Sequence, residues 1–75
     1  MFKKGQRVKP INGEKVLNDK LLSVGGRRII ESAGCIGTIT KIRVEDGRPI
    51  NFVTYDGTDG IVTQGFRDDE IEVVK

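Results

Sequence analysis

Residues 35–55 read CIGTITKIRVEDGRPINFVTY and hold the clearest strand signals in the chain. The first part, residues 35–44, is rich in β-branched residues, which favour a strand over a helix. The tripeptide Glu45-Asp46-Gly47 is typical of a tight turn, because glycine adopts positive φ and aspartate hydrogen-bonds its own backbone. Residues 50–55 then supply a return strand. The stretch therefore predicts a β-hairpin.

The apolar residues of this hairpin also indicate which faces it presents. Ile36 and Ile42 do not share one phase with Ile39, so the first strand is expected to contain a kink or bulge, or to be covered on both faces for part of its length. In the return strand, Phe52 and Ile50 share one face, whereas Val53 and Tyr55 share the other. We expect the rings of Phe52 and Phe66 to lie in the core.

Short apolar runs separated by glycine and Asp-Gly turns continue on both sides of the hairpin, and the chain has ten glycines. This pattern is typical of short strands joined by tight turns. We expect a first strand at 6–10 with Val8 pointing inward, a second turn at 56–60, a strand at 61–64, a connector at 65–70 containing Phe66, one turn of 3₁₀ helix at 67–70, and a last strand at 71–74.

Residues 11–34 allow two interpretations. Gly25-Gly26 lies between aliphatic residues and reads as the turn of a hairpin, which we favour. The alternative is a helix over residues 14–24, with Val16 and Leu17 on its apolar side and Gly25 as its C-cap.

The length of 75 residues allows one domain, spanning 1–75, with a small core. The chain has one cysteine and no histidine. These counts exclude an internal disulfide and zinc sites built on cysteine and histidine, and they remove the commonest general base. We therefore expect a non-enzymatic protein with no catalytic residues, no metal and no cofactor.

The formal charge of +2 is unevenly distributed along the chain. Residues 1–37 carry eight lysines and arginines against three acidic residues, whereas residues 38–75 carry five against eight. Such asymmetry is typical of a face that binds polyanions, unless the two halves interleave in space and their charges mix.

No stretch reaches the roughly 20 apolar residues that a membrane-spanning helix needs. Phe2-Lys3-Lys4 runs directly into a polar segment, without the apolar region of a signal peptide. A single cysteine is common in proteins of reducing compartments. We expect no membrane partner and a cytoplasmic location.

Three segments resemble one family. Residues 4–9, KGQRVK, look like the opening strand of SH3-like barrels of the KOW and Tudor-like kind. Residues 34–39, GCIGTI, look like the step into their second strand, and residues 66–74 are similar to their last turn and final strand. The resemblance implies an all-β fold: a small SH3-like barrel of about five short strands with one 3₁₀ turn. Residues 11–33 depart from it as an inserted hairpin or loop after the first strand.

The favoured function is contact with DNA or RNA, duplex or structured, because arginine and lysine suit phosphate groups and Gly25-Gly26 would let the backbone approach a ligand closely. The expected contacts come from the first strand and the inserted hairpin: Lys3, Lys4, Arg7, Lys9, Arg27 and Arg28. Tyr55 is a possible platform for stacking a base. Cys35 is the one candidate for a reactive thiol, and residues 68–72 and 56–60 are candidates for holding a cation. We interpret Cys35 as a small, partly buried residue at a strand start and the two acidic runs as solvated turns.

The alternative function is binding of a protein partner or a second copy, as in small bacterial or phage accessory proteins. An inserted hairpin offers an edge strand or an apolar tip, formed by Leu21, Leu22, Ile29 and Ile30. The sequence leaves open whether the partner is DNA, RNA or protein.

Overall fold

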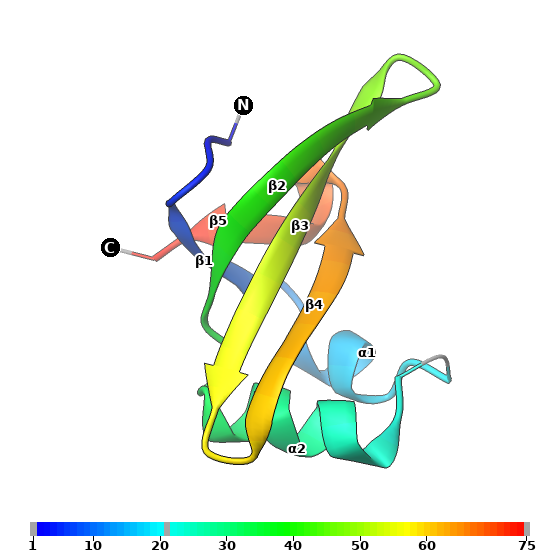
Figure 1. Ribbon diagram of the computed structural model, residues 1–75. Helices are drawn as coiled ribbons and strands as arrows, with labels where there is room; N and C mark the ends of the chain where they lie inside the picture. The colour runs from blue at the N-terminus through cyan, green and yellow to red at the C-terminus, as the bar shows by residue number, and fades with distance from the viewer. Residues whose placement is uncertain (1, 21, 75) are drawn as a thin grey trace.

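The structure is a computed structural model that describes residues 2–20 and 22–74. It is mostly β, as expected, with five antiparallel strands in one sheet of order β4-β3-β2-β1-β5 (Figure 1). The strands are β1 (Arg7–Pro10), β2 (Gly37–Glu45), β3 (Arg48–Gly57), β4 (Gly60–Phe66) and β5 (Ile71–Val73). The remaining elements are α1 (Gly13–Leu17), α2 (Val24–Ser32) and the 3₁₀ turn η1 (Asp68–Glu70).

The predicted hairpin is formed by β2 and β3. Glu45 pairs with Arg48, so the loop contains only Asp46 and Gly47. Both loop residues have positive φ, 53° for Asp46 and 73° for Gly47. Two consecutive left-handed residues are what a two-residue hairpin turn of type I′ requires, and an Asp-Gly pair adopts them at little cost. The expected 3₁₀ turn and the last strand are likewise present.

The irregular phase of β2 is explained by a β-bulge, as the sequence suggested. Ile39 pairs with Val53 and Lys41 with Phe52, so Thr40 is an extra residue without a counterpart on β3. Beyond the extra residue, the alternation of inward and outward side chains is shifted by one position. As a result, Ile39 is buried and Ile42 packs against the same core, although they are three residues apart.

The inserted hairpin predicted around Gly25-Gly26 is wrong, because this segment is the first turn of α2. The Ser23 hydroxyl accepts a hydrogen bond from the Gly26 amide at 2.9 Å and caps the helix. Neither glycine has the positive φ that a tight hairpin turn needs. The alternative helix over 14–24 is also wrong in its bounds, because α1 ends at Leu17 and is followed by non-helical residues.

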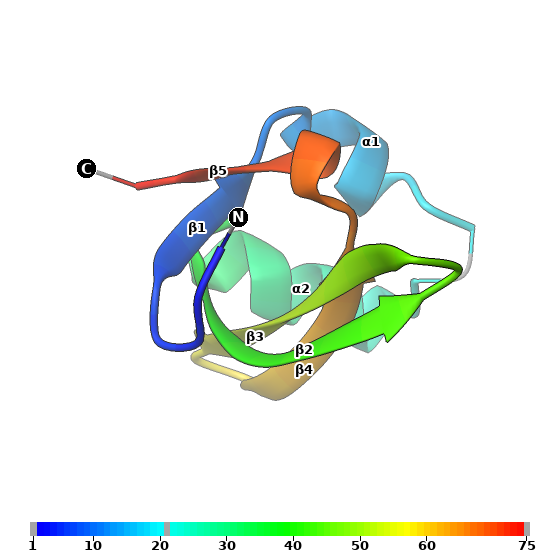
Figure 2. The same ribbon diagram turned by 90° about the horizontal axis from the view of Figure 1, so that it is seen from above.

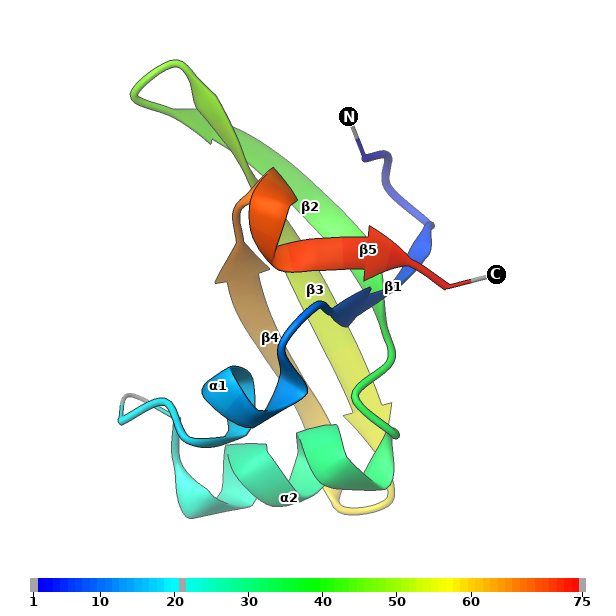
Figure 3. The same ribbon diagram turned by 180° about the vertical axis from the view of Figure 1, so that it is seen from behind.

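Helix α2 packs against β3 and β4 at the end of the sheet where these two strands join (Figures 1 and 3). The contact is close at Gly57, where a Cβ atom would lie 2.5 Å from the carbonyl oxygen of Ile29. The Thr58 amide donates to the Ser32 hydroxyl at 3.1 Å and fixes the end of the helix. The insertion therefore completes the domain as a packed helix.

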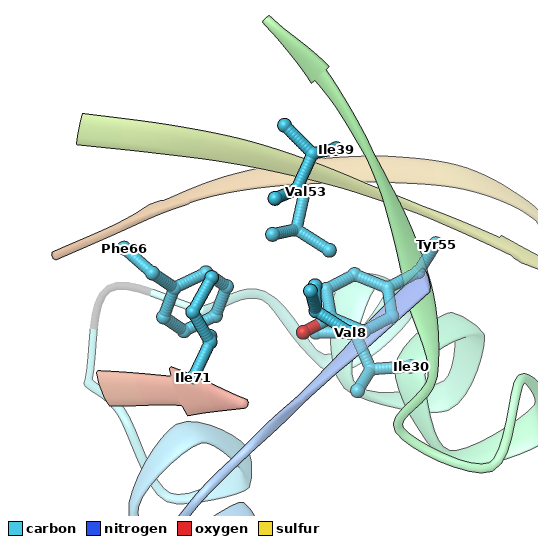
Figure 4. Packing of buried hydrophobic residues seen from close by; sticks show 7 residues of the cluster. All are labelled: Val8, Ile30, Ile39, Val53, Tyr55, Phe66 and Ile71. Carbon is cyan, nitrogen blue, oxygen red and sulfur yellow. The ribbon is translucent and has the colours of Figure 1, made fainter. Parts of the chain in front are cut away.

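The core takes residues from every strand and from α2 (Figure 4). The seven buried apolar residues are Val8, Ile30, Ile39, Val53, Tyr55, Phe66 and Ile71. Val8 and Phe66 occupy the interior as expected. Phe52 does not: it is partly exposed and is not part of the core or of the residues packed against it.

The sheet curves around this core, with β1 and β5 turned away from β4 (Figure 2). In the described residues, β4 pairs only with β3, and β5 pairs only with β1. The turn η1 connects these two edge strands, and buried Asn51 on β3 holds it by donating to Asp68 at 2.7 Å and to the Phe66 carbonyl at 3.3 Å. Closure of the sheet into a complete barrel stays a prediction.

Candidate functional site

The outer face of β2, β3 and β4 carries side chains that the core does not use. On β3, Asn51, Val53 and Tyr55 are buried, so the alternate residues Phe52 and Thr54 face away from the interior. Phe52 is only partly buried there. An aromatic ring on the solvent side of a sheet is available to a ligand, which makes this face the first place to look for a site.

The bulge in β2 determines which side chains lie beside Phe52. Ile39 and Ile42 both turn inward, so the two residues between them, Thr40 and Lys41, share the outer face. Lys41 is the register partner of Phe52. Side chains in such a pair leave backbones about 5 Å apart, so the side chains of Lys41 and Phe52 start side by side on the outer face.

Threonine hydroxyls form a hydrogen-bonded row across the same face. Thr40 and Thr54 are joined at 2.9 Å between their hydroxyl oxygens, and Thr54 and Thr63 are joined at 2.9 Å. At the β1 end of the face, the Arg7 guanidinium donates to the Thr38 hydroxyl at 3.0 Å. Since Thr38 is the register partner of Thr54, Arg7 is on the outer face with these hydroxyls.

The N-terminal segment places two lysines at the border of this face. The Gly5 amide donates to the Ile39 carbonyl at 2.8 Å, and the Ile39 amide donates to the Gln6 carbonyl at 3.0 Å. These bonds hold the turn that contains Lys3 and Lys4 against β2. We call the group of Lys3, Lys4, Arg7, Lys41 and Phe52 the outer-face patch.

The cations of the outer-face patch have no acidic partners among the residues that the structure describes. The ion pairs in that part of the chain are Lys9–Glu72 at 3.6 Å, Arg27–Glu31 at 2.9 Å and Arg43–Glu45 at 3.4 Å. All three are exposed, and such pairs contribute little to stability. The outer-face patch thus holds four cations without an ion-pair partner among the described residues, and one of them, Lys41, is the register neighbour of Phe52.

The structure divides the nucleic-acid residues expected from the sequence into separate groups. Lys3, Lys4 and Arg7 come together as part of the patch. Lys9 shares β1 with Arg7 but pairs with Glu72 on β5, so the basic and acidic halves do mix at this point. Helix α2, which contains Arg27 and Arg28, lies at the opposite end of the molecule from the N-terminus in both Figure 1 and Figure 3. The single basic face expected from the sequence is not formed.

Tyr55 is not a stacking platform, because its side chain is fully buried. Its hydroxyl group has no hydrogen-bond partner among the described residues. Burial raises the pKa of the Tyr55 hydroxyl well above its usual value, with a smaller contribution from Cys35. The ring belongs to the core, where strand alternation puts it with Val53.

The described residues of the apolar tip expected for a protein interface, Leu22, Ile29 and Ile30, do not form an exposed tip. Ile30 is fully buried, and Leu22 and Ile29 pack against the core, because α2 turns its apolar side toward the sheet. Leu21 lies outside the described residues. Leu22, Ile29 and Ile30 therefore contribute to the folded core instead of presenting a surface.

Cys35 is partly buried and follows the end of α2 in a left-handed conformation, with φ of 60°. Burial raises the pKa of its thiol, and the negative charge of Glu31 raises it further. The thiol is therefore protonated at neutral pH, which does not suit a nucleophile. In the part of the chain that the structure describes, no three acidic or cysteine side chains come together to hold a metal ion.

Two adjoining hollows of about 270 and 250 Å³ lie between α1 and η1 and share Lys15, Val16 and Glu70 as lining residues. Their lining mixes one lysine with several carboxylates, including Asp69 and Asp19. The charged lining of this groove is therefore mainly acidic, in contrast to the cations of the outer-face patch.

Sequence reasoning missed Phe52 and Lys41 as site residues. The alternation of β3 already set Phe52 apart from Val53 and Tyr55, and that signal was sufficient to place it outside. Comparison with protein families, with curated proteins and with solved structures finds no match to this chain. None of the helices in the described residues is long and apolar enough to cross a membrane.

Proposed function

We propose that this chain is a small non-enzymatic module that binds the phosphate backbone of nucleic acid through the outer-face patch. The observation that carries the proposal is the group of four cations, Lys3, Lys4, Arg7 and Lys41, without acidic partners in the described chain. Phosphates would supply the missing counter-charges. Arg7 is already oriented by Thr38, so little of its side-chain freedom is lost on binding.

Of the expected N-terminal cations, the proposal keeps Lys3, Lys4 and Arg7 and leaves out Lys9, which pairs with Glu72. Lys41 replaces Arg27 and Arg28 as the further contact. It includes membership of the SH3-like barrels of the KOW and Tudor-like kind and a cytoplasmic location. Its support is the strand order, with β1 between β2 and β5, and the 3₁₀ turn between β4 and β5. The free thiol of Cys35 agrees with a reducing compartment.

The first test measures binding of labelled DNA and RNA oligonucleotides by fluorescence anisotropy at salt concentrations from about 50 to 200 mM. Each phosphate contact contributes roughly −0.7 to −0.9 to the slope of log K against log salt, so four cations predict a slope of about −3. Replacing Arg7→Gln and Lys41→Gln together should remove about half of that slope and weaken binding at least about tenfold.

The matched control is Arg27→Gln with Arg28→Gln, which removes the same formal charge from α2. Binding of this variant should stay close to that of the parent, because helix α2 lies at the opposite end of the molecule from the N-terminus. The proposal is overturned if the parent binds no oligonucleotide at about 50 mM salt, or if both double variants lose affinity equally.

A further inference from the structure

The surroundings of Phe52 bear on which form of nucleic acid the patch takes. Across β4, its register partner is Gly65, which has no side chain to cover the ring. A Cβ atom on Gly65 would lie 3.4 Å from the Phe52 ring and 3.0 Å from Ile50. The ring and Ile50 therefore lie against bare backbone at Gly65, and they form an apolar surface beside the threonine row.

Beside the Phe52 ring itself, the charged register neighbour lies on β2. Lys41 is the register partner of Phe52 on β2, whereas Gly65 is its partner on β4. Across three strands the outer face thus changes from cation to ring to bare backbone. Strands lie about 4.8 Å apart, so a phosphate at Lys41 would place its nucleotide's base within reach of the ring.

We infer that the outer-face patch binds single-stranded nucleic acid, with one base stacked on Phe52 and the backbone following Lys41 and Arg7. The inference rests on the proposed function and specifies its ligand. In a duplex the bases are stacked on each other, so a ring on an open sheet face reaches them only when the strand is unpaired. Every base has a π-face, so the contact needs no particular sequence.

The test compares a single strand of about 15 nucleotides with the duplex of the same sequence. The parent protein should bind the single strand about tenfold more tightly. Replacing Phe52→Leu keeps an apolar side chain at this place and should weaken single-strand binding about tenfold, while duplex binding and the salt slope stay unchanged. Circular dichroism and a thermal melt verify that the variant is folded.

A second variant gives a reading that does not depend on loss of affinity. The chain contains no tryptophan, so Phe52→Trp introduces a single fluorophore at the proposed stacking position. Its fluorescence should be quenched when a single strand binds, and affinity should be kept. The control is Val24→Trp, because Val24 is 73% exposed on α2, and its fluorescence should not change.

The outcomes separate the two proposals. No binding of either ligand at low salt overturns the proposed function and this inference together. Salt-dependent binding in which the duplex binds as well as the single strand, or in which Phe52→Leu and Phe52→Trp show no effect, overturns only the inference. Stronger single-strand binding that needs Phe52 and quenches Phe52→Trp confirms both.

Discussion

Tyr55 combines two properties that work against each other. Its ring fills the centre of the core, but its hydroxyl group is buried without a hydrogen-bond partner among the described residues. A buried polar group left in this state costs about 1–3 kcal/mol of stability. The ring therefore stabilises the fold, while the oxygen that it carries reduces that gain.

Replacing Tyr55→Phe should raise the free energy of unfolding by about 1 kcal/mol, because the ring stays and the unpaired hydroxyl group is removed. Urea denaturation followed by circular dichroism measures this change. A loss of stability in the variant would show that the hydroxyl group makes a favourable contact in solution.

The same substitution has a pH dependence of known sign. Burial raises the pKa of Tyr55 in the folded state above the ordinary value of about 10. The stability that depends on a protonated Tyr55 is therefore fully present below that value. It is lost as pH rises above it, because the unfolded chain ionises first. Stability of the parent should fall between about pH 9 and 11 more steeply than that of Tyr55→Phe.

At the scale of elements, glycine has two different effects on α2, one from within the helix and one from the strand beneath it. Gly25 is exposed in the first turn, and a Cβ atom there would meet only the Ser23 hydroxyl at 4.0 Å. Gly57, in contrast, lies directly under the helix backbone, where the same atom would collide with the Ile29 carbonyl. The first glycine weakens the helix, and the second allows it to dock.

Alanine substitutions should therefore have opposite signs at these two positions. Gly25→Ala should stabilise the protein by up to about 1 kcal/mol, because alanine is the better helix former. Gly57→Ala should cost about 1–3 kcal/mol or more, because the helix must move away from the strand. Paired urea denaturation curves measure both changes, and equal effects would contradict the packing of α2 against β3.

The same helix marks the limit of what the sequence predicts. The β2–β3 hairpin, its turn and the bulge follow from local signals in residues 35–55, because turn chemistry and alternation act over a few residues. Local signals do not determine the conformation of Gly25-Gly26. Its conformation depends on Ile30 reaching the core and on Gly57 leaving room for the helix, and both are contacts between distant parts of the chain.

The candidate site was predictable only in part for a similar reason. Lys3, Lys4 and Arg7 are neighbours in the sequence and stay together in the fold. Lys41 joins them through the pairing of β1 with β2 and through the bulge, which the sequence indicates but does not locate. Arg27 and Arg28 were separated from them once the insertion folded as a helix.

At the scale of the whole molecule, one small core supports both the sheet and the helices. Among the described residues, seven apolar side chains are buried, and Ile30 is the one of these that lies in α2. A chain of this size has a small margin of stability, so each of these side chains accounts for a large share of it. The insertion is therefore part of the cooperative unit.

Replacing Ile30→Ala should cost about 2–5 kcal/mol and leave a large fraction of the protein unfolded at room temperature. A thermal melt followed by circular dichroism measures the loss. Val24→Ala, at an exposed position of the same helix, serves as the control and should change stability by less than about 0.5 kcal/mol. A mild effect at Ile30 would instead agree with an exposed apolar surface on this segment.

The bulge at Thr40 has a consequence for variation in chain length. In a regular strand, losing one residue turns every later side chain to the opposite face. In β2, losing Thr40 would give a regular strand in which Ile39 and Ile42 still point inward and Lys41 still lies opposite Phe52. Residue 40 is therefore a position at which the strand tolerates a one-residue deletion while its two faces keep their identities.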